Sequence, residues 1–322
     1  MSNEERGPLL THHSSLVTPV RVRAYAKVNV ALEVLGQRAD GYHEICTVLQ
    51  AIGLYDELTC APAAELTLEA PPLPDDAPNL VLVAAEALQQ ATGCQAGAAL
   101  TLRKEIPIAG GLGGGSADAA AALVALNAVW KLYLEREELA RIAAQLGSDV
   151  PYFLLGGTVL ATGRGEQLEV LPDPLPRWLV ILVPGDILPA KTRTIYDQLD
   201  ARWYTSGGFV LTLAQRLRTN PSSSWRPLGN ALEPTAMELF PSLRAARDAL
   251  LEVTETVWRE MPTPAGEDDA PDWNMSGAGP ALFTYFGERR AAERCRALLA
   301  ARGYHAFAVP TLGRRDCEDV WG

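Results

Sequence analysis

A run of glycines stands between a strand pattern and an alanine-rich helix pattern, and this feature restricts the fold more than any other. Five glycines occupy the six positions from Gly110 to Gly115, and Ser116 follows them. Glycine lets successive backbone N–H groups turn toward one anion without interference from a Cβ atom, and a helix start adds partial positive charge. Residues 107–116 are therefore interpreted as a phosphate-binding loop.

Other known glycine patterns fit this loop less well. Gly110 and Gly115 have the spacing of the Walker pattern GxxxxGK[ST], but Ser116 stands where that pattern needs lysine. The GxGxxG pattern and the signatures of protein kinases do not occur in the sequence. A flexible linker or a close helix–sheet contact remains as the plain alternative, which is disfavoured because linkers rarely join a strand so tightly to a strong helix.

Composition and charge narrow the class of protein. A chain of 322 residues with 48% hydrophobic and 21% charged residues predicts a soluble globular protein of two domains. The net charge of −11 argues against a nucleic-acid partner. No apolar run approaches the roughly 20 residues that span a bilayer, and the charged start does not resemble a signal peptide. We expect a cytoplasmic protein without a membrane segment.

The number and spacing of cysteines and histidines predict no metal site formed by protein side chains. The five cysteines are scattered without any C-x-x-C spacing, and only four histidines are available. We therefore expect reduced thiols and no zinc site, and we expect any metal to arrive with a nucleotide.

The pattern of elements predicts an extension at residues 1–19, a first domain at 20–172 and a second at 173–322, with prolines 172, 174 and 176 at the boundary. Even positions from Val22 to Val34 are apolar, which predicts a strand with one buried face. A second strand is expected at 44–58 with a possible break at Gly53, and a further strand at 98–104. Helices are expected from the cap Asn79 to Gly93, at 117–130 and at 136–146, followed by a turn capped by Ser148.

The second half predicts an α+β domain. Strands are expected at 178–183, 281–286 and 305–309, and helices at 194–199, 238–251 and 288–302. Residues 204–229 have no clear pattern, and the acidic, proline-rich stretch at 262–271 is typical of an exposed loop.

Five segments together resemble the GHMP kinase superfamily of galacto-, homoserine, mevalonate and phosphomevalonate kinases. They are residues 107–118 (PIAGGLGGGSAD), 24–29 (AYAKVN), 38–43 (RADGYH), 147–151 (GSDVP) and 275–280 (MSGAGP). Within the superfamily the sequence is most similar to the 4-diphosphocytidyl-2-C-methyl-D-erythritol kinase family of the non-mevalonate isoprenoid pathway. The resemblance implies an α+β two-domain GHMP kinase fold, with an N-terminal domain like ribosomal protein S5 domain 2 and a ferredoxin-like C-terminal domain.

Two residues are the candidates for catalysis. Phosphoryl transfer needs a carboxylate that accepts or organises the proton of the hydroxyl and cations over the developing charge. Taken alone, Lys27 is typical of a solvated strand face and Asp149 of a helix start. The resemblance implies that Asp149 is the catalytic carboxylate and that Lys27 pairs with it and polarises the acceptor hydroxyl. Asn29 shares the odd-numbered face with Lys27, so we expect it to help hold the substrate.

The resemblance also implies the binding residues. ATP is expected at the loop, with Mg²⁺ bound to the nucleotide; the residues implied are Asn79, Lys104, Pro107, Gly110, Gly111, Leu112, Gly113, Gly114, Gly115 and Ser116. Ser116 is the candidate for contact with the phosphates or Mg²⁺, whereas Asp118 is expected to interact with the helix dipole as a capping acid.

The substrate residues implied are Tyr42, His43, Tyr196, Ser276 and Gly277. Tyr42 and Tyr196 would stack on a cytosine ring while His43 reads its edge. The match at Tyr196 needs one extra residue in the alignment.

Three functions stay open at this point: a cytidyl-methylerythritol kinase, another GHMP kinase acting on a sugar, homoserine or mevalonate, and a nonenzymatic nucleotide-binding relative. The Tyr42–His43 pair favours the first over the second, and the presence of both Lys27 and Asp149 favours an enzyme. The expected partner is thus a small molecule, and the sequence leaves a monomer and a homodimer open.

Overall fold

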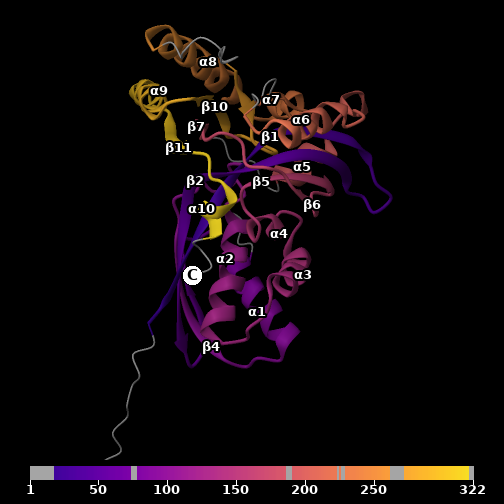
Figure 1. Cartoon of the computed structure of the whole chain (residues 1–322), viewed down its shortest axis with the longest axis vertical. Coiled ribbons are helices and arrows are strands. Elements are labelled where there is room, and N and C mark those ends of the chain that lie inside the picture. Colours follow the sequence, from indigo (N-terminus) through magenta and orange to yellow (C-terminus); the bar gives the residue numbers. More distant parts are fainter. Residues whose placement is uncertain are drawn as a thin grey trace, which may run out of the picture.

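The computed structural model describes residues 18–73, 78–185, 191–222, 225, 229–261 and 272–318. Almost all of the predicted extension at 1–19 and the proline-rich stretch at 262–271 lie outside the described residues. The described chain forms two sheets with helices packed against them (Figure 1).

The first sheet is built on a long antiparallel pair, β1 (Val20–Gln37) and β2 (His43–Ala63). Its remaining strands are β3 (Leu66–Glu69), β4 (Gly97–Arg103), β5 (Thr158–Gly163), β6 (Gln167–Val170) and β8 (Gly229–Asn230). One edge of β2 pairs with β5 through residues 45–50 and with β4 through residues 57–63. The two long strands therefore extend from the region of β4 to the region of β5 (Figure 1).

Gly53 does not break the second strand, contrary to the possibility raised by the sequence. The register between β1 and β2 shifts between Tyr25 and Ala26, which pair with Tyr55 and Ile52, so residues 53 and 54 form a bulge. A Cβ atom at Gly53 would lie 2.8 Å from the ring of Pro310. The glycine thus admits a close approach by the C-terminal segment while the strand continues.

The prediction of one buried face for the first strand is wrong over its second half, since residues 26–34 are buried on both faces. The even face packs into the core. The odd face is covered by segments remote in sequence: the backbone N–H of Lys27 donates to the carbonyl of Leu112 at 3.0 Å, and Val210 N–H donates to the Glu33 carboxylate at 2.8 Å. The polar residues on this face are therefore held inside the protein rather than in solvent.

Four helices cover one end of the first sheet: α1 (Leu80–Thr92), α2 (Gly114–Val129), α3 (Arg136–Leu146) and α4 (Val150–Phe153). Asn79 caps α1 by accepting the Val81 N–H at 3.0 Å, and Gly93 ends it in the left-handed region at φ +74°, as predicted. Helix α2 begins inside the glycine run. The N-cap residue of α4 is Asp149 and not Ser148, so that prediction is wrong.

The second sheet is antiparallel with the order β11-β7-β10-β9. Its strands are β7 (Trp178–Val183), β9 (Asn274–Met275), β10 (Leu282–Phe286) and β11 (His305–Pro310). The helices in the second half of the chain are α5 (Lys191–Asp197), the 3-10 turn η1 (Ala201–Trp203), α6 (Gly208–Thr219), α7 (Glu233–Leu239), α8 (Leu243–Glu260), α9 (Arg289–Ala301) and α10 (Arg314–Glu318).

The single helix expected at 238–251 is in fact two helices. Helix α7 ends at Leu239 and α8 begins at Leu243, with Pro241 between them. A proline in a helix interior removes a hydrogen bond and clashes with the preceding turn, so the chain turns there. The helix expected at 194–199 likewise begins earlier, at Lys191, and ends at Asp197.

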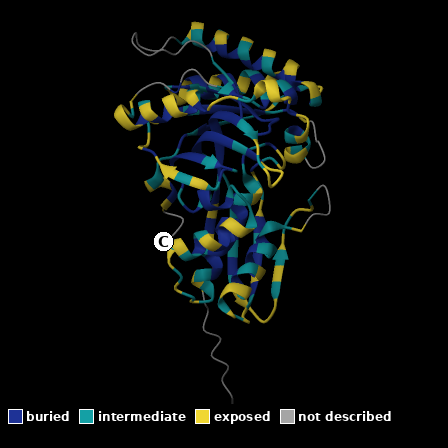
Figure 2. Cartoon of the chain, turned by 90° about the vertical axis from the view of Figure 1, so that its right-hand side faces the viewer, coloured by how far each residue is buried: buried dark blue, intermediate teal, exposed yellow. Residues whose placement is uncertain are grey.

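The core extends across both halves of the chain. Figure 2 shows buried residues concentrated in the strands, with exposed residues along the outer sides of the helices. Strand β8 from the second half pairs in parallel with β1 at Ala31 and Leu32. The two halves thus share a sheet, and the division at residues 172 and 173 stays a prediction.

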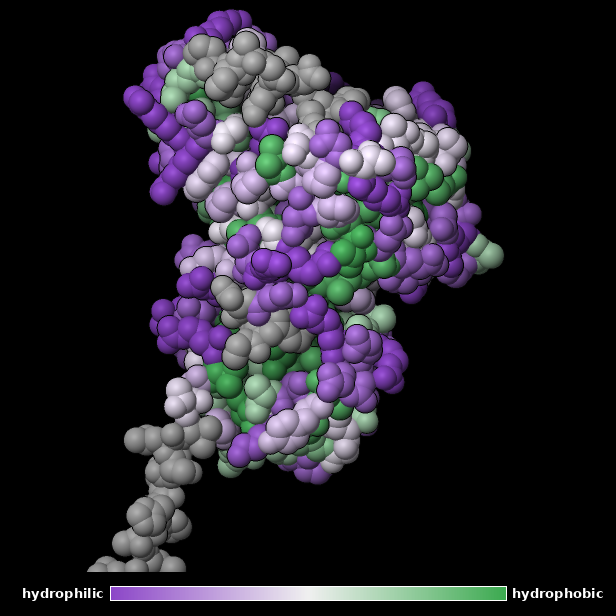
Figure 3. Space-filling model, viewed as in Figure 1, coloured by the Kyte–Doolittle hydropathy of each residue, from purple (hydrophilic) through white to green (hydrophobic). Residues whose placement is uncertain are grey.

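The apolar residues of the long helices face this core. Helix α8 buries Leu250, Val253 and Val257, and within the described ranges we find no helix with the length and apolar character to cross a membrane. On the face drawn in Figure 3, hydrophilic residues predominate and the apolar atoms form separate patches.

Candidate active site

The glycine run forms a tight loop that ends in the first turn of α2. Gly111 and Gly113 have φ values of +86° and +77°, which glycine adopts without strain. Gly113 is the N-cap residue of α2, and no side chain caps this helix. The first N–H groups of α2 therefore have no intrahelical partner and are available to an anion, as a phosphate loop requires.

Lys27 lies directly against this loop. Its amino group donates to the Asn29 side-chain oxygen at 2.7 Å and to the carbonyl of Gly111 at 3.0 Å, and it lies 3.8 Å from the Asp149 carboxylate. Burial lowers the pKa of Lys27, and the negative charge of Asp149 partly opposes that shift. The structure thus brings Lys27, Asn29, Asp149 and the loop into one site, although the roles of these residues stay predictions.

Asp149 is placed at the start of α4 with its side chain 41% exposed. Its carboxylate makes no capping hydrogen bond to the helix. Asp149 thus stands at the helix start, as its plain interpretation predicted, but its side chain is not used up as a cap. A partly exposed carboxylate beside a buried amino group is suited to accept a proton from a hydroxyl that enters from solvent.

A buried ion-pair cluster lies beneath the other side of the loop. The Lys104 amino group contacts the Asp118 carboxylate at 2.6 Å and the Asp56 carboxylate at 2.5 Å. Asp56 also accepts the N–H groups of Glu105 and Ile106, at 2.6 and 2.8 Å. The cluster therefore fixes the chain just before the loop to β2 and to α2.

The prediction that Asp118 caps the helix is wrong. Helix α2 begins at Gly114, which places Asp118 in the second turn, where it is buried against Lys104. Burial raises the pKa of Asp118 to about 7 in spite of the opposing charge of Lys104. One of its oxygens, Oδ1, is buried and has no hydrogen-bond partner.

Asn79 and Lys104, two of the residues expected to bind ATP, belong to segments close to the start of α2. A Cβ atom at Gly114 would lie 3.2 Å from the Lys104 amino group, and one at Gly115 would lie 3.6 Å from the side chain of Leu80. The start of α1, with its cap Asn79, is therefore adjacent to the start of α2. The structure shows Asn79 as a helix cap, and its contact with ATP stays a prediction.

The second glycine turn, at residues 276–279, packs on the phosphate loop. The Ser276 hydroxyl donates to the carbonyl of Gly111 at 2.9 Å and accepts the Asn29 N–H at 3.3 Å. A Cβ atom at Gly277 would lie 3.4 Å from the Lys27 amino group. Ser276 and Gly277 are thus next to the catalytic candidates, and Asn230 holds the turn by donating to the Gly277 carbonyl at 2.8 Å.

Aromatic side chains gather at the start of β2. The His43 and Tyr196 rings lie 5.0 Å apart with a tilt of 32°, and the Tyr204 hydroxyl lies 3.2 Å from His43 Nε2. Burial lowers the pKa of His43, with a smaller opposing effect from Asp197. A neutral imidazole offers one donor and one acceptor, which suits the reading of a base edge.

The aromatic group of His43, Tyr196 and Tyr204 lies near Asp149, the carboxylate that pairs with Lys27. Burial, and then the negative charge of Asp149, raise the pKa of the Tyr196 hydroxyl. Arg164 lies over the Tyr42 ring at 4.7 Å, and a Cβ atom at the adjacent Gly165 would lie 3.7 Å from the Asp149 carboxylate. Tyr42 is 55% exposed and faces Arg164 rather than packing with His43 and Tyr196.

Sequence reasoning missed Tyr204, Asp56 and Lys191, whose amino group donates to the carbonyl of Ala109 in the loop at 2.8 Å. Tyr204 lies at the edge of the stretch that has no periodic pattern. Asp56 carried a usable signal, because it stands between Leu54 and Leu58 on the buried face of a strand, where an unpaired carboxylate is costly. Lys191 comes just before the predicted helix and has no pattern of its own.

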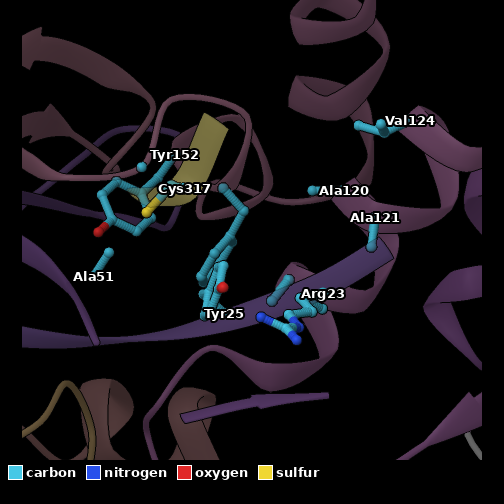
Figure 4. Close-up of a pocket in the computed structure, with 12 residues that line it drawn as sticks. Arg23, Tyr25, Ala51, Ala120, Ala121, Val124, Tyr152 and Cys317 are labelled. Atoms are coloured by element: carbon cyan, nitrogen blue, oxygen red, sulfur yellow. The ribbon is translucent and has the colours of Figure 1, made fainter. Parts of the chain in front are cut away.

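Two hollows flank the site without containing it. A cavity of about 30 Å³ lies between β1 and α2; Figure 4 shows Arg23 and Tyr25 on one side of it and Tyr152 beside Cys317 on another. That volume suits one or two water molecules and not a nucleotide. A groove of about 490 Å³ borders residues 108–110 and 303–305, and Gly110 is the one predicted site residue in its lining.

Comparisons with known proteins identify the family of this chain. The family model of the GHMP kinases N terminal domain matches residues 79–157, which contain the loop and Asp149. The chain is 47% identical over 245 residues to the 4-diphosphocytidyl-2-C-methyl-D-erythritol kinase of Salinispora tropica, covering 72% of this chain and 76% of that protein. It is 39% identical over 279 residues to the kinase of the same name from Pelotomaculum thermopropionicum, covering 85% and 91%. The chain belongs to the 4-diphosphocytidyl-2-C-methyl-D-erythritol kinase family.

A solved structure shows that the chain also has the fold of this kinase family. The crystal structure of a 4-(cytidine 5′-diphospho)-2C-methyl-D-erythritol kinase superimposes with a TM-score of 0.74 at 32% identity, covering 91% of this chain and all of that one. The resemblance found in the sequence and the expected GHMP kinase fold are therefore confirmed. As a kinase, a member of this family takes ATP as its co-substrate.

Proposed function

We propose that this chain transfers the γ-phosphoryl group of ATP to the 2-hydroxyl of 4-diphosphocytidyl-2-C-methyl-D-erythritol, in the non-mevalonate route to isoprenoid precursors. The observation that carries the proposal is the position of the His43–Tyr196 ring pair beside Lys27 and Asp149. A ring-binding group and a phosphoryl-transfer pair in one site suit an alcohol that carries a nucleobase. Homoserine and mevalonate have no ring, and a plain sugar has no planar nucleobase that could stack on these side chains and offer an edge to His43.

Each group has a role in the proposed reaction. The free N–H groups at the start of α2 hold the phosphates of ATP. Lys27 polarises the acceptor hydroxyl, and Asp149 accepts its proton as the oxygen bonds to the γ-phosphorus and ADP leaves. Asn29 fixes the Lys27 amino group by its 2.7 Å hydrogen bond. The Lys27 amino group is thus held in advance at the place where negative charge develops during transfer. Such a preorganised charge lowers the activation barrier.

Magnesium is proposed to enter with ATP. Among the residues that the structure describes, no three His, Cys, Asp or Glu side chains are grouped to hold a metal ion. The phosphates would supply most of the oxygen ligands that Mg²⁺ prefers, with the Ser116 hydroxyl at the start of α2 as the candidate protein ligand. When bound, the ion neutralises charge on the phosphates during transfer.

A coupled assay of ADP release tests the proposed substrate. We expect turnover with 4-diphosphocytidyl-2-C-methyl-D-erythritol and at least about a hundredfold lower kcat/KM with the uridyl analogue, because exchange of an amino donor for a carbonyl mispairs buried polar groups. Homoserine, mevalonate and galactose serve as comparison substrates. Equal turnover of the cytidyl and uridyl compounds, or efficient phosphorylation of galactose, would point to another GHMP kinase activity.

A stacking residue gives a second prediction. We expect Tyr42→Ala to weaken binding of cytidine 5′-diphosphate by about 1 to 3 kcal/mol, the range for loss of one base stack, with little change in ATP affinity. The measurement is isothermal titration calorimetry with each nucleotide. Tyr133→Ala is the matched control, because Tyr133 is 82% exposed in the connection between α2 and α3. Equal cytidine affinity in both variants would remove Tyr42 from the site.

A further inference from the structure

Lys191, the first residue of α5, has its amino group where the two glycine-bearing loops meet. The amino group donates to the carbonyl of Ala109 in the phosphate loop at 2.8 Å and also to the carbonyl of Gly279 in the second turn. A Cβ atom at Gly111 would lie 2.9 Å from that same Gly279 carbonyl. The Lys191 side chain therefore joins the two loops next to their contact at Gly111.

The charge of Lys191 is poorly compensated. Burial, and then the positive charge of Lys27, lower the pKa of Lys191 to about 7. Lys27 has Asp149 at 3.8 Å, whereas no carboxylate of the described residues is recorded within ion-pair distance of Lys191. The site thus holds two amino groups beside one carboxylate. A half-buried cation with only carbonyl partners is stabilised by an anionic ligand.

We propose that Lys191 is a second phosphate-binding cation of this site, which exchanges its carbonyl partners for a phosphate oxygen when substrate binds. The proposal rests on the proposed function and adds a residue to it. A charge-assisted hydrogen bond to phosphate is stronger than the bonds to carbonyls that it replaces. The same exchange frees the Ala109 and Gly279 carbonyls, so the contact between the two loops responds to the ligand.

Two sources of that phosphate oxygen fit the geometry. Ala109 belongs to the loop that is proposed to hold ATP, which makes a phosphate of ATP one source. Helix α5 also carries Tyr196, whose ring packs on His43, so the diphosphate of a cytidyl acceptor is the other. Both are phosphate oxygens with the same chemistry toward an amino group, and separate titrations with the two ligands distinguish them.

Proton uptake gives a signature of this contact. The charged groups described around the Lys191 amino group are Lys27 on β1 and, beside Lys27, Asp149 at α4. At pH 8 a group with a pKa of about 7 is mostly neutral, and a bound phosphate raises its pKa because it favours the ammonium form. Ligand binding at pH 8 therefore takes up close to one proton per site at Lys191.

The experiment is calorimetric titration of the full chain at pH 8 in two buffers of different ionisation enthalpy. Cytidine 5′-diphosphate and the Mg²⁺ complex of a nonhydrolysable ATP analogue are the two probes, and wild type, Lys191→Met and Lys191→Arg are the proteins. We expect Lys191→Met to bind one probe about tenfold more weakly or worse, and to lose the proton uptake seen with that probe. Weaker binding of the cytidine probe assigns the acceptor diphosphate, and weaker binding of the ATP analogue assigns ATP.

Lys191→Arg is the matched control, because arginine keeps the positive charge beside Lys27 but does not titrate in this range. We expect it to bind the affected probe within about threefold of wild type while taking up fewer protons. A purely structural role would not change proton uptake in this way. Binding of both probes by Lys191→Met within twofold of wild type, or equal uptake by wild type and Lys191→Arg, overturns the proposal.

The proposed substrate and the role of Lys191 are tested separately in this design. If the wild type binds the ATP analogue but not the cytidine probe, the proposed substrate is wrong, and the ATP titration still decides the role of Lys191. If the wild type binds both and Lys191→Met matches it, the role of Lys191 is wrong and the proposed substrate stands. Thermal unfolding of each variant verifies that it is folded before titration.

Discussion

Asp149→Asn is expected to lower kcat by at least about a hundredfold, with only a modest change in the KM for the cytidyl substrate. The substitution keeps the size of the side chain and removes its capacity to accept a proton, and positioned proton acceptors contribute about 10² to 10⁴ in rate. The Asp149 carboxylate lies 3.8 Å from the Lys27 amino group and makes no capping bond to α4. Its loss should therefore affect the chemical step more than folding.

The measurement is steady-state ADP release at saturating ATP, together with thermal unfolding of each variant. Asp248→Asn is the control, because this acid lies on α8, is 65% exposed and pairs with its neighbour Arg247. We expect that variant to match the wild type. A kcat for Asp149→Asn within threefold of the wild type would show that another group accepts the proton, and the catalytic assignment would fail.

The sequence predicted the local structure well where chain-local signals decide it. The cap at Asn79, the stop at Gly93 and the strand at 178–183 were all readable, because side-chain capping, left-handed glycine and an apolar run each act within a few residues. The helix break at Pro241 had a local signal as well, which the apolar periodicity of the flanking residues obscured.

The burial of the polar face of β1 was not readable from the sequence. Lys27, Asn29 and Glu33 alternate with apolar residues, which indicates a strand half in solvent. Each of them is buried by a segment that comes from more than 80 positions away: the phosphate loop, the Ser276 turn and α6. Periodicity reports that a strand has two faces, but it does not report what covers the second one.

The glycines of the loop show the same limit within one motif. From the sequence, one explanation serves for all five glycines, which is close approach of the backbone to phosphate. The structure separates them, because a Cβ atom at Gly114 would point toward Ile106 and the Lys104 amino group, whereas one at Gly115 would have Leu80 as its one neighbour within 4 Å. A Cβ atom at Gly111 would enter the second glycine turn. Glycine at this position therefore allows the two loops to pack together, besides leaving the backbone accessible.

Gly111→Ala is accordingly expected to lower kcat/KM by about a hundredfold or more. The new Cβ atom would lie 2.2 Å from the carbonyl oxygen of Ser276 and 2.9 Å from that of Gly279, and both are backbone atoms that cannot rotate away. The two loops must therefore separate. Because the Gly111 carbonyl accepts hydrogen bonds from Lys27 and Ser276, that movement displaces the Lys27 amino group. A displacement of about 1 Å at reacting groups is enough for a loss of this size.

Gly93→Ala separates the cost of backbone strain from the cost of the clash. Gly93 has a φ of +74°, close to the +86° of Gly111, but a Cβ atom there would meet nothing within 4 Å. Both variants carry the strain of a left-handed alanine, about 1 to 2 kcal/mol in the free energy of unfolding. Gly111→Ala alone carries the clash with Ser276. We expect Gly93→Ala to unfold at a lower temperature than the wild type while keeping its kcat/KM, and Gly111→Ala to lose both. Similar activity in the two variants would mean that strain alone explains the glycine at 111, and that the contact between the loops does not position Lys27.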